Sequence, residues 1–259
     1  MSSPSSLKTF PGITLSLPSP TILLITLTSP PTNSFTTSLY SSLTSSFHYA
    51  LTLPITCVLL TSSGPYFSTG VDFHDQFTNY SEKTVKNFML TFINFTLPII
   101  AVVQGPAIGI GCTMLFHCDM VFAVEKRGSK DNYFMTPFVK WCLAPEFCSS
   151  VVLGRRGGLK AEMLLFGERV SVRRMRDLGM VKSSPDYTAE NIVGEAVKYV
   201  EEKLTGHVHS RESAEGYVRL TRLRRNVDWK LEEVMENEFE EIRRRVARGD
   251  VEDAVMSKM

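Results

Sequence analysis

The sequence predicts an α/β fold followed by a helical C-terminal region. Short apolar runs rich in β-branched residues, which are typical of strands, alternate with segments of helical periodicity. This alternation, in units of roughly 30 residues, is typical of parallel strands joined by crossover helices. After Gly154 the apolar runs give way to helical segments with charged faces. We find no internal repeat and no long linker, so we expect one large domain, or a core with a small appendage.

The predicted strands lie in the first half of the chain. Residues 21–28 form an apolar, β-branched run that ends at Ser29-Pro30-Pro31. Residues 55–61 form a second such run, and residues 98–104 a third that is apolar throughout, as expected of a strand buried on both faces. A fourth strand is predicted at residues 120–124.

Helices are predicted between these strands and through the last third of the chain. Their apolar residues recur at helical intervals, and Pro54 ends the first of them. The predicted helices lie at residues 35–51, 85–95, 112–116, 159–166, 172–178, 189–204 and 229–247. The apolar face of the last helix consists of Leu231, Val234, Met235, Phe239, Ile242 and Val246.

The composition argues against several classes of function. The formal net charge of +1 argues against nucleic-acid binding, which usually needs a concentrated basic surface. The 5 cysteines are odd in number and include no C-x-x-C pair, so we expect neither a disulfide framework nor a structural metal. No apolar run reaches the roughly 18 residues that cross a bilayer.

Two glycine-rich turns each follow a predicted buried strand. Thr69-Gly-Val71 leaves backbone N–H groups free in a loop. Gly109-Ile-Gly111 does the same at the start of a predicted helix, where unpaired N–H groups and the helix dipole favour negative charge. Two converging N–H donors would form an oxyanion hole for a carbonyl that becomes an enolate. On spacing alone, ordinary turns remain the alternative.

Five segments between residues 21 and 204 resemble, in consistent order, the crotonase (enoyl-CoA hydratase/isomerase) superfamily. Phe67-Ser-Thr-Gly-Val-Asp72 resembles its F-S-x-G-x-D loop. Gln104-Gly-Pro-Ala-Ile-Gly-Ile-Gly111, followed by Cys118-Asp119, resembles its N-G-x-A-x-G-x-G…C-D segment. The other similar segments are Asn33-Ser34-Phe35 at the N-A-L turn, residues 159–167 and residues 178–181.

The resemblance implies a crotonase-like fold of repeated ββα units, with a helical C-terminal region that completes an oligomer. Trimers, or dimers of trimers, are the norm in that family. It also implies an acyl-CoA substrate, with CoA as part of the substrate and no further cofactor or metal. The implied oxyanion donors are the backbone N–H groups of Val71 and Ile110. The implied substrate-binding residues are Ser68, Thr69, Gly70, Gly109, Phe138 and Leu143.

The acid–base residues decide among the reactions of this superfamily. Hydratases of the family use two glutamates, and the matching positions here are Thr113 and Phe138. Residues 143–150 instead resemble the P-E-G-C-S-S segment of peroxisomal-type Δ3,Δ2-enoyl-CoA isomerases, in which one glutamate moves the proton. Glu146 occupies the position of that glutamate, and Phe147 replaces the glycine that follows it.

The predicted role of Glu146 is that of the single catalytic acid/base. It would remove the C2 proton of a 3-enoyl-CoA and return it at C4, giving trans-2-enoyl-CoA in the β-oxidation of unsaturated fatty acids. An apolar surround would raise its pKa toward the working range. The expected members of that surround are Phe138, Trp141, Leu143 and Phe147. The bulk of Phe147 would narrow the acyl channel.

Other interpretations stay open at this point. Another crotonase reaction, such as enoyl-CoA hydration, and a non-catalytic acyl-CoA-binding protein are the alternatives. We expect Asp72 and Asp119 to hold backbone groups and His117 to be a satisfied core residue. The candidates for contacts to the CoA phosphates, by position alone, are Arg222, Arg224 and Arg225.

The last part of the sequence suggests both a boundary and an address. We expect residues 1–204 to form a crotonase-like core domain and residues 205–259 a C-terminal helical region. The sequence ends in Ser257-Lys258-Met259, which resembles the Ser-Lys-Leu address of peroxisomal proteins. The predicted localisation is therefore the peroxisome, with the peroxisomal import receptor as a partner.

Overall fold

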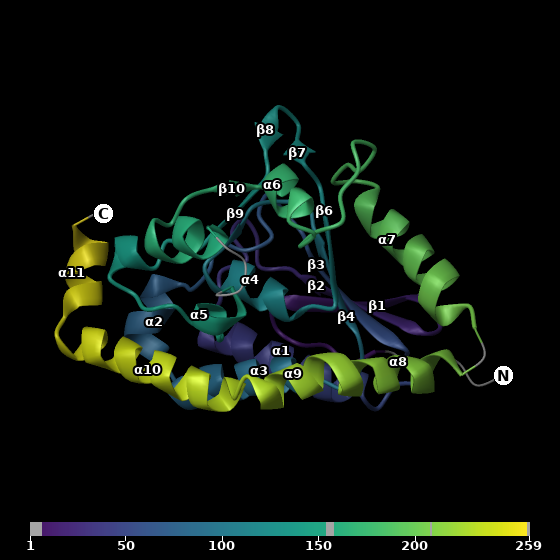
Figure 1. Cartoon of the computed structure of the whole chain (residues 1–259), viewed down its shortest axis with the longest axis horizontal. Coiled ribbons are helices and arrows are strands. Elements are labelled where there is room, and N and C mark those ends of the chain that lie inside the picture. The colour runs from purple at the N-terminus through teal and green to yellow at the C-terminus, as the bar shows by residue number, and fades with distance from the viewer. Residues whose placement is uncertain (1–6, 154–157, 208, 258–259) are drawn as a thin grey trace.

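A five-stranded sheet lies at the centre of the computed structural model, which describes residues 7–153, 158–207 and 209–257. Its strands are β1 (Ile13–Ser19), β2 (Ile22–Leu27), β3 (Cys57–Ser62), β4 (Ile99–Val103) and β6 (Met120–Ala123), in the spatial order β1-β2-β3-β4-β6 (Figure 1). β1 pairs with β2 in antiparallel fashion, and the other neighbours are parallel. The parallel strands are joined by crossover helices, among them α1 (Thr37–Ala50) and α3 (Glu82–Ile93).

The central strands are continuously apolar because both faces of the sheet are covered. In β3, Val58 and Leu60 belong to the larger core, together with residues of α1 and α3. Cys57 and Leu59 point to the opposite face, where a second core contains residues of α7 (Ile192–Val200). Every residue of β3 and β4 is buried. A parallel sheet with helices on both faces requires this pattern.

A smaller sheet and a set of short elements lie beyond the carboxyl ends of the parallel strands. β10 (Val170–Ser171), β9 (Tyr133–Met135) and β5 (Ala107–Ile108) form this sheet in that order. The hairpin of β7 (Lys126–Arg127) and β8 (Lys130–Asp131) projects from the molecule (Figure 1). The short helical elements are α2 (Phe73–Asn79), α4 (Ile110–Thr113), η1 (Met114–His117), η2 (Val139–Trp141), α5 (Ser149–Val152), η3 (Ala161–Leu165) and α6 (Val172–Asp177).

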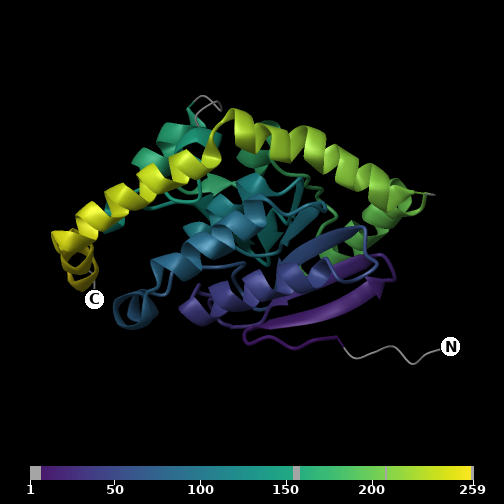
Figure 2. The same cartoon turned by 90° about the horizontal axis from the view of Figure 1, so that it is seen from below.

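The C-terminal helices form a long arm that runs along one side of the molecule (Figure 2). After η4 (Glu201–Thr205), the arm consists of α8 (Ser210–Val218), η5 (Arg219–Leu223), α9 (Arg224–Asp228), α10 (Leu231–Ala247) and α11 (Asp250–Met256). Leu231, Met235 and Phe239 of α10 are buried in the larger core, whereas Val246 is exposed. No helix in the described parts of the chain is long and apolar enough to cross a bilayer.

The elements predicted from apolar runs agree closely with the structure, and the differences have physical reasons. β2, β3, β4 and β6 lie within one or two residues of their predicted positions. β1 was not predicted, because three of its seven residues are exposed polar residues or proline, and its partner is the adjacent β2. Residues 159–166 and 201–205 contain π-helical turns, a distinction that apolar periodicity does not resolve.

Candidate active site

The candidate site lies where two neighbouring parallel strands end. Because β3 and β4 are parallel and adjacent, the loops that follow them leave the same edge of the sheet. The two loops then pair with each other, since the Ile108 N–H donates to the Ser68 carbonyl oxygen at 2.9 Å. This pairing brings the two predicted glycine turns together.

Gly70 and Gly109 make the closest approach between the two turns. Their φ angles are +91° and +56°, in the left-handed region that favours glycine. A Cβ atom on Gly70 would lie 3.1 Å from the Ile108 carbonyl oxygen and 3.4 Å from the Gly109 Cα atom. Only glycine therefore allows both the backbone conformation and the contact at position 70.

The two proposed oxyanion donors belong to these turns. The backbone of Phe35 pairs with Gly70 and Asp72, at 2.8 and 3.1 Å, so the intervening Val71 N–H points to the other side. Ile110 is the first residue of α4, whose N–H has no partner within the helix. Among the described residues, no backbone acceptor is found for either N–H group. Both groups are thus available to a carbonyl oxygen.

A cavity of about 420 Å³ opens beside the turns. Its lining is largely apolar and includes Thr69, Gly70, Val71, Phe73, Ile108, Gly109, Met135, Phe138, Trp141, Leu143 and Glu146. A smaller cavity of about 40 Å³ continues past Glu146 toward α10, where Phe239 and Ile242 line it. The structure therefore brings the expected residues Thr69, Gly70, Gly109, Phe138 and Leu143 together around one space.

Ser68 was expected to contact the substrate, and the structure corrects this. Its side chain is fully buried and does not line the cavity. The hydroxyl donates to the Asn33 carbonyl oxygen at 2.8 Å and accepts from the Gly70 N–H at 3.1 Å. Ser68 instead fixes the position of the turn that carries Val71.

Glu146 brings a carboxyl group to the cavity in an environment that favours its neutral form. Burial, and to a lesser extent the negative charge of Glu238, raise its pKa from 4.5 to about 8. A carboxyl group with such a pKa can both accept and return a proton near neutral pH. The predicted upward shift therefore agrees with the surroundings found.

Phe147 does not narrow the cavity, contrary to the expectation from its size. Its ring is fully buried and packs against Phe88, Phe92 and His117, with ring centroids 5.8, 5.7 and 4.8 Å away. Its φ angle is 57°, and that of Cys148 is 56°. The backbone thus takes the left-handed conformation that suits glycine, and this conformation turns the ring away from the cavity into the core.

The two positions at which hydratases of the family have glutamate offer no carboxylate here. Thr113 is buried, and its hydroxyl donates to the Ile110 carbonyl oxygen at 3.4 Å. Phe138 presents its ring to the cavity. Asp72 is the N-cap of α2, accepting from the Asp75 N–H at 3.0 Å, and is not an additional acid.

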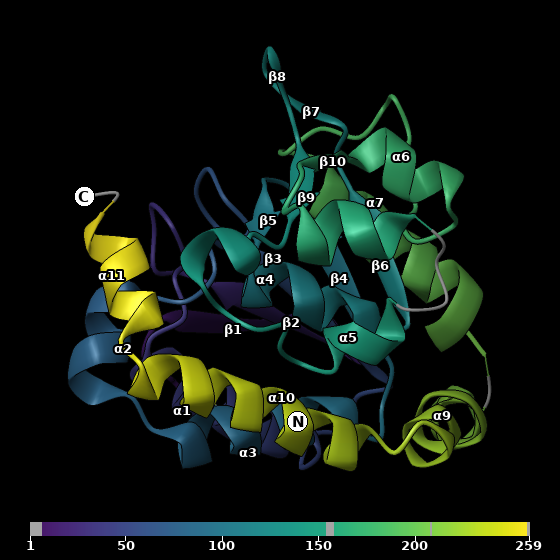
Figure 3. The same cartoon turned by 60° about the vertical axis from the view of Figure 1, so that its left-hand side comes forward.

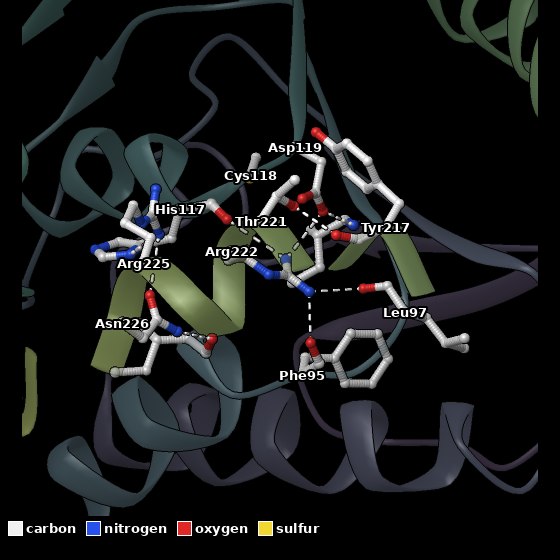
Figure 4. A network of polar contacts seen from close by, with 12 residues as sticks. Phe95, Leu97, His117, Cys118, Asp119, Tyr217, Thr221, Arg222, Arg225 and Asn226 are labelled. Atoms are coloured by element: carbon white, nitrogen blue, oxygen red, sulfur yellow. Dashed lines mark hydrogen bonds and ion pairs between the residues drawn. The ribbon is translucent and has the colours of Figure 1, made fainter. Parts of the chain in front are cut away.

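Arg222 is a structural residue and not a phosphate contact. Its guanidinium is buried, pairs with Asp119 at 3.0 Å and donates to the carbonyl oxygens of Phe95 and Leu97 (Figure 4). The basic residues that do line the cavity are Lys140 and Arg169. Sequence reasoning missed them because Lys140, in the short η2, and Arg169, in the loop before β10, belong to none of the motifs.

The described residues contain no group of three or more His, Cys, Asp and Glu side chains that could hold a metal ion. A family model described as enoyl-CoA hydratase/isomerase matches residues 19–245.

The chain belongs to the enoyl-CoA hydratase/isomerase family. An enoyl-CoA hydratase/isomerase from Pseudoalteromonas atlantica T6c has a TM-score of 0.84 to it, with 28% sequence identity over 95% of this chain and 96% of that chain. The predicted crotonase-like fold, an α/β fold with a helical C-terminal region, is thereby confirmed.

Several curated relatives of this family member are longer than it is. Human testis-specific chromodomain protein Y 2 is 31% identical over 72% of this chain and 35% of its own length. Rat enoyl-CoA delta isomerase 2 is 30% identical over 87% of this chain and 57% of its own length. Mouse enoyl-CoA delta isomerase 3, peroxisomal, is 34% identical over 54% of this chain and 46% of its own length. The chain thus spans between about a third and somewhat more than half of these relatives.

Proposed function

We propose that this protein is a Δ3,Δ2-enoyl-CoA isomerase in which Glu146 is the only catalytic acid/base. The observation that carries the proposal is that one carboxyl group with a raised pKa lines an apolar cavity beside the two glycine turns, whose Val71 and Ile110 N–H groups have no backbone acceptor among the described residues. The rat relative named enoyl-CoA delta isomerase 2 adds support.

The chemistry needs one base and one oxyanion hole. The C2 proton of a 3-enoyl-CoA is acidic because it is α to the thioester and allylic to the double bond. Glu146 takes this proton, and the electron pair moves into the thioester carbonyl, whose oxygen accepts hydrogen bonds from the Val71 and Ile110 N–H groups. The dienolate then takes the same proton back from Glu146 at C4, which yields the conjugated trans-2-enoyl-CoA. No water and no second carboxylate enter the reaction.

The CoA part of the substrate needs positive charge near the mouth of the cavity. Lys140 and Arg169 line the cavity, and the Arg169 guanidinium lies 4.6 Å from the ring centroid of Tyr133. We assign the phosphate contacts to these two residues in place of Arg222.

The proposal is tested by conversion of trans-3-hexenoyl-CoA to trans-2-hexenoyl-CoA, followed through the absorbance of the conjugated thioester. We expect Glu146→Gln to lower kcat by roughly 10²–10⁴-fold, the usual contribution of a positioned acid/base, with little change in affinity for hexanoyl-CoA. Glu232→Gln, an exposed carboxyl group on α10, is the matched control and should keep the wild-type rate.

Three results would contradict the proposal. Equal rates for wild type and Glu146→Gln would place the base elsewhere. Rapid hydration of crotonyl-CoA without isomerisation would favour a hydratase. Tight binding of acyl-CoA without turnover at any chain length would identify a non-catalytic binding protein.

We further propose a peroxisomal location and a role in the β-oxidation of unsaturated fatty acids. The support is the Ser257-Lys258-Met259 sequence, of which Lys258 and Met259 lie outside the described residues, and the mouse relative named as peroxisomal. A fluorescent fusion that keeps this tripeptide exposed should colocalise with a peroxisomal marker, and the same fusion without it should not. The proposed oligomer, a homotrimer or dimer of trimers, is tested by light scattering on the purified protein.

A further inference from the structure

One peptide bond next to Glu146 is held from both sides by buried side chains. The Phe147 carbonyl oxygen accepts a hydrogen bond from His117 Nε2 at 2.7 Å. The N–H of the same peptide, that of Cys148, donates to Glu238 Oε2 at 2.7 Å. His117 comes from η1 and Glu238 from α10, so two elements far apart in the sequence meet at this bond.

The conformation of this peptide explains why it needs to be held. Phe147 and Cys148 are consecutive non-glycine residues with φ angles of 57° and 56°. A left-handed conformation costs such residues roughly 1–2 kcal/mol each. Strained backbone persists only where the surroundings fix it, and rotation of this peptide would move the adjacent Glu146.

Glu238 binds the loop through several hydrogen bonds. Besides the Cys148 N–H, it accepts from the Ser150 N–H at 3.0 Å and from the Ser150 hydroxyl. Three donors thus converge on a side chain that is only 7% exposed. Both oxygens of Glu238 accept, which a carboxamide could not reproduce, because it has only one acceptor oxygen. Figure 3 shows α10 next to α5, and the residues that donate these bonds lie at the start of α5.

The hydrogen bond between His117 and Phe147 fixes which ring nitrogen of His117 carries the proton. Burial, followed by the charge of Arg225, lowers its pKa to about 3, so the ring is neutral. The Phe147 oxygen can only accept, so the proton is on Nε2 and donates to it. Nδ1 is then an acceptor, and Arg225 Nη2 lies 3.4 Å from it (Figure 4).

We propose that Glu238 and His117 are positioning residues for Glu146, which together fix the Phe147–Cys148 peptide and thereby aim the carboxyl group at the substrate. The inference rests on the proposed function of Glu146. It assigns to the C-terminal arm a part in the isomerase site beyond packing against it.

Several charged and titratable groups lie around Glu238, and replacing Glu238 would change their electrostatic surroundings. On the loop these are Glu146, whose pKa the charge of Glu238 raises, and Cys148. On α10, Glu241 lines the same surface hollow as Glu238. On α9, Arg225 acts on Cys148 from the other side.

The decisive variant is Glu238→Gln, which keeps the shape of the side chain but removes one acceptor and the charge. We expect kcat for hexenoyl-CoA to fall roughly 10- to 100-fold through misplacement of Glu146, with the Kd for hexanoyl-CoA within about threefold. The rise of kcat/KM with pH, which in the wild type follows ionisation of Glu146 near pH 8, should move to lower pH. Damage to the fold alone would lower activity without shifting the pH at which kcat/KM rises.

A second measurement reports on the loop without using activity. Hydrogen exchange of the peptide that contains residues 146–150 should be faster in Glu238→Gln, because the Cys148 and Ser150 N–H groups bond to different oxygens of Glu238 and the carboxamide keeps only one acceptor oxygen. His117→Gln, which can still donate to the Phe147 oxygen, should retain most of kcat, whereas His117→Leu should not. Glu232→Gln is again the control.

The outcomes separate the two proposals. A folded Glu238→Gln variant with wild-type kcat and pH profile overturns the positioning proposal, whatever the result for Glu146→Gln. Undiminished activity in Glu146→Gln overturns the proposed function instead. An inactive wild-type protein overturns both.

Discussion

At the scale of single residues, the two buried carboxyl groups link stability to pH. Burial raises the pKa of Glu146 from 4.5 to about 8 and that of Glu238 from 4.5 to about 7. Each group binds its proton more tightly in the folded chain than in the unfolded one. The stability that results is fully present below pH 4.5 and is lost as the pH rises through the folded pKa values.

We therefore predict that Glu146→Gln flattens the decline of stability with rising pH. Between pH 5 and pH 8 the free energy of unfolding of the wild type should fall relative to this variant, by up to about 1.4 kcal/mol for each unit between the folded and unfolded pKa. Urea unfolding of both proteins across this range is the measurement. Parallel curves would show that Glu146 titrates normally.

Phe147 offers a separate test of backbone strain. Removing its ring from the core should cost about 3–5 kcal/mol in Phe147→Ala. Phe147→Gly loses the same ring but relieves a left-handed residue, which is worth roughly 1–2 kcal/mol. We expect both variants to be less stable than the wild type, with glycine the more stable of the two in urea unfolding. A glycine variant less stable than the alanine variant would contradict the strain.

Some residues of the site belong to recognisable sequence motifs, and others do not. Glu146, Val71 and Ile110 stand within short motifs, and two of them, Glu146 and Val71, line the same cavity. Glu238 lies 90 residues from its Cys148 partner, and nothing in the helical pattern of α10 distinguishes it from the exposed glutamates around it. Long-range hydrogen bonds of this kind leave no periodic signal.

At the scale of elements, Arg222 fixes the C-terminal arm to the sheet. It ties η5 to Asp119 at the start of β6, and Asn226 of α9 donates to the Ile93 carbonyl oxygen at 2.6 Å. Asp119 in turn accepts from the Ile99 N–H at 2.8 Å. One buried ion pair therefore connects the arm, β4 and β6.

We predict that Arg222→Met destabilises the protein by about 3–5 kcal/mol, because it leaves the buried Asp119 carboxylate unpaired. Arg224→Met, on an exposed position two residues later, should cost no more than about 0.5 kcal/mol. Adding Asp119→Asn to Arg222→Met should recover part of the loss. Equal effects of the two arginine variants in thermal unfolding would refute the role of Arg222.

The sequence predicted those helices that are buried along one face and those strands that are buried on both faces. β3 and β4 are apolar throughout because helices cover both faces, and the apolar stripe of α10 predicted its buried side except at Val246. β1 has no such signal, since it is an edge strand with much of its surface exposed. Its position is set by the adjacent β2.

At the scale of the whole molecule, the site is built from two parts of the fold, the central sheet and the C-terminal arm. The sheet carries the two turns, while α10 approaches the cavity from the opposite end of the chain. Ion pairs of Lys86 with Glu236 and of Arg243 with Glu82, both at 2.6 Å, join α10 to α3. These pairs are partly exposed and worth little. The burial of Leu231, Met235 and Phe239 therefore supplies most of the attachment.

Because Glu238 lies far along the chain from the loop that it binds, it is synthesised well after that loop. A nascent polypeptide leaves the ribosome N-terminus first, at roughly 5–20 residues per second. The residues of the sheet, both turns and Glu146 are therefore synthesised about 4.5–18 s before residue 238, since 90 residues separate it from Cys148. During that interval every reacting group exists but the proton donor is not aimed. Catalytic competence would thus be among the last properties that a newly made molecule acquires.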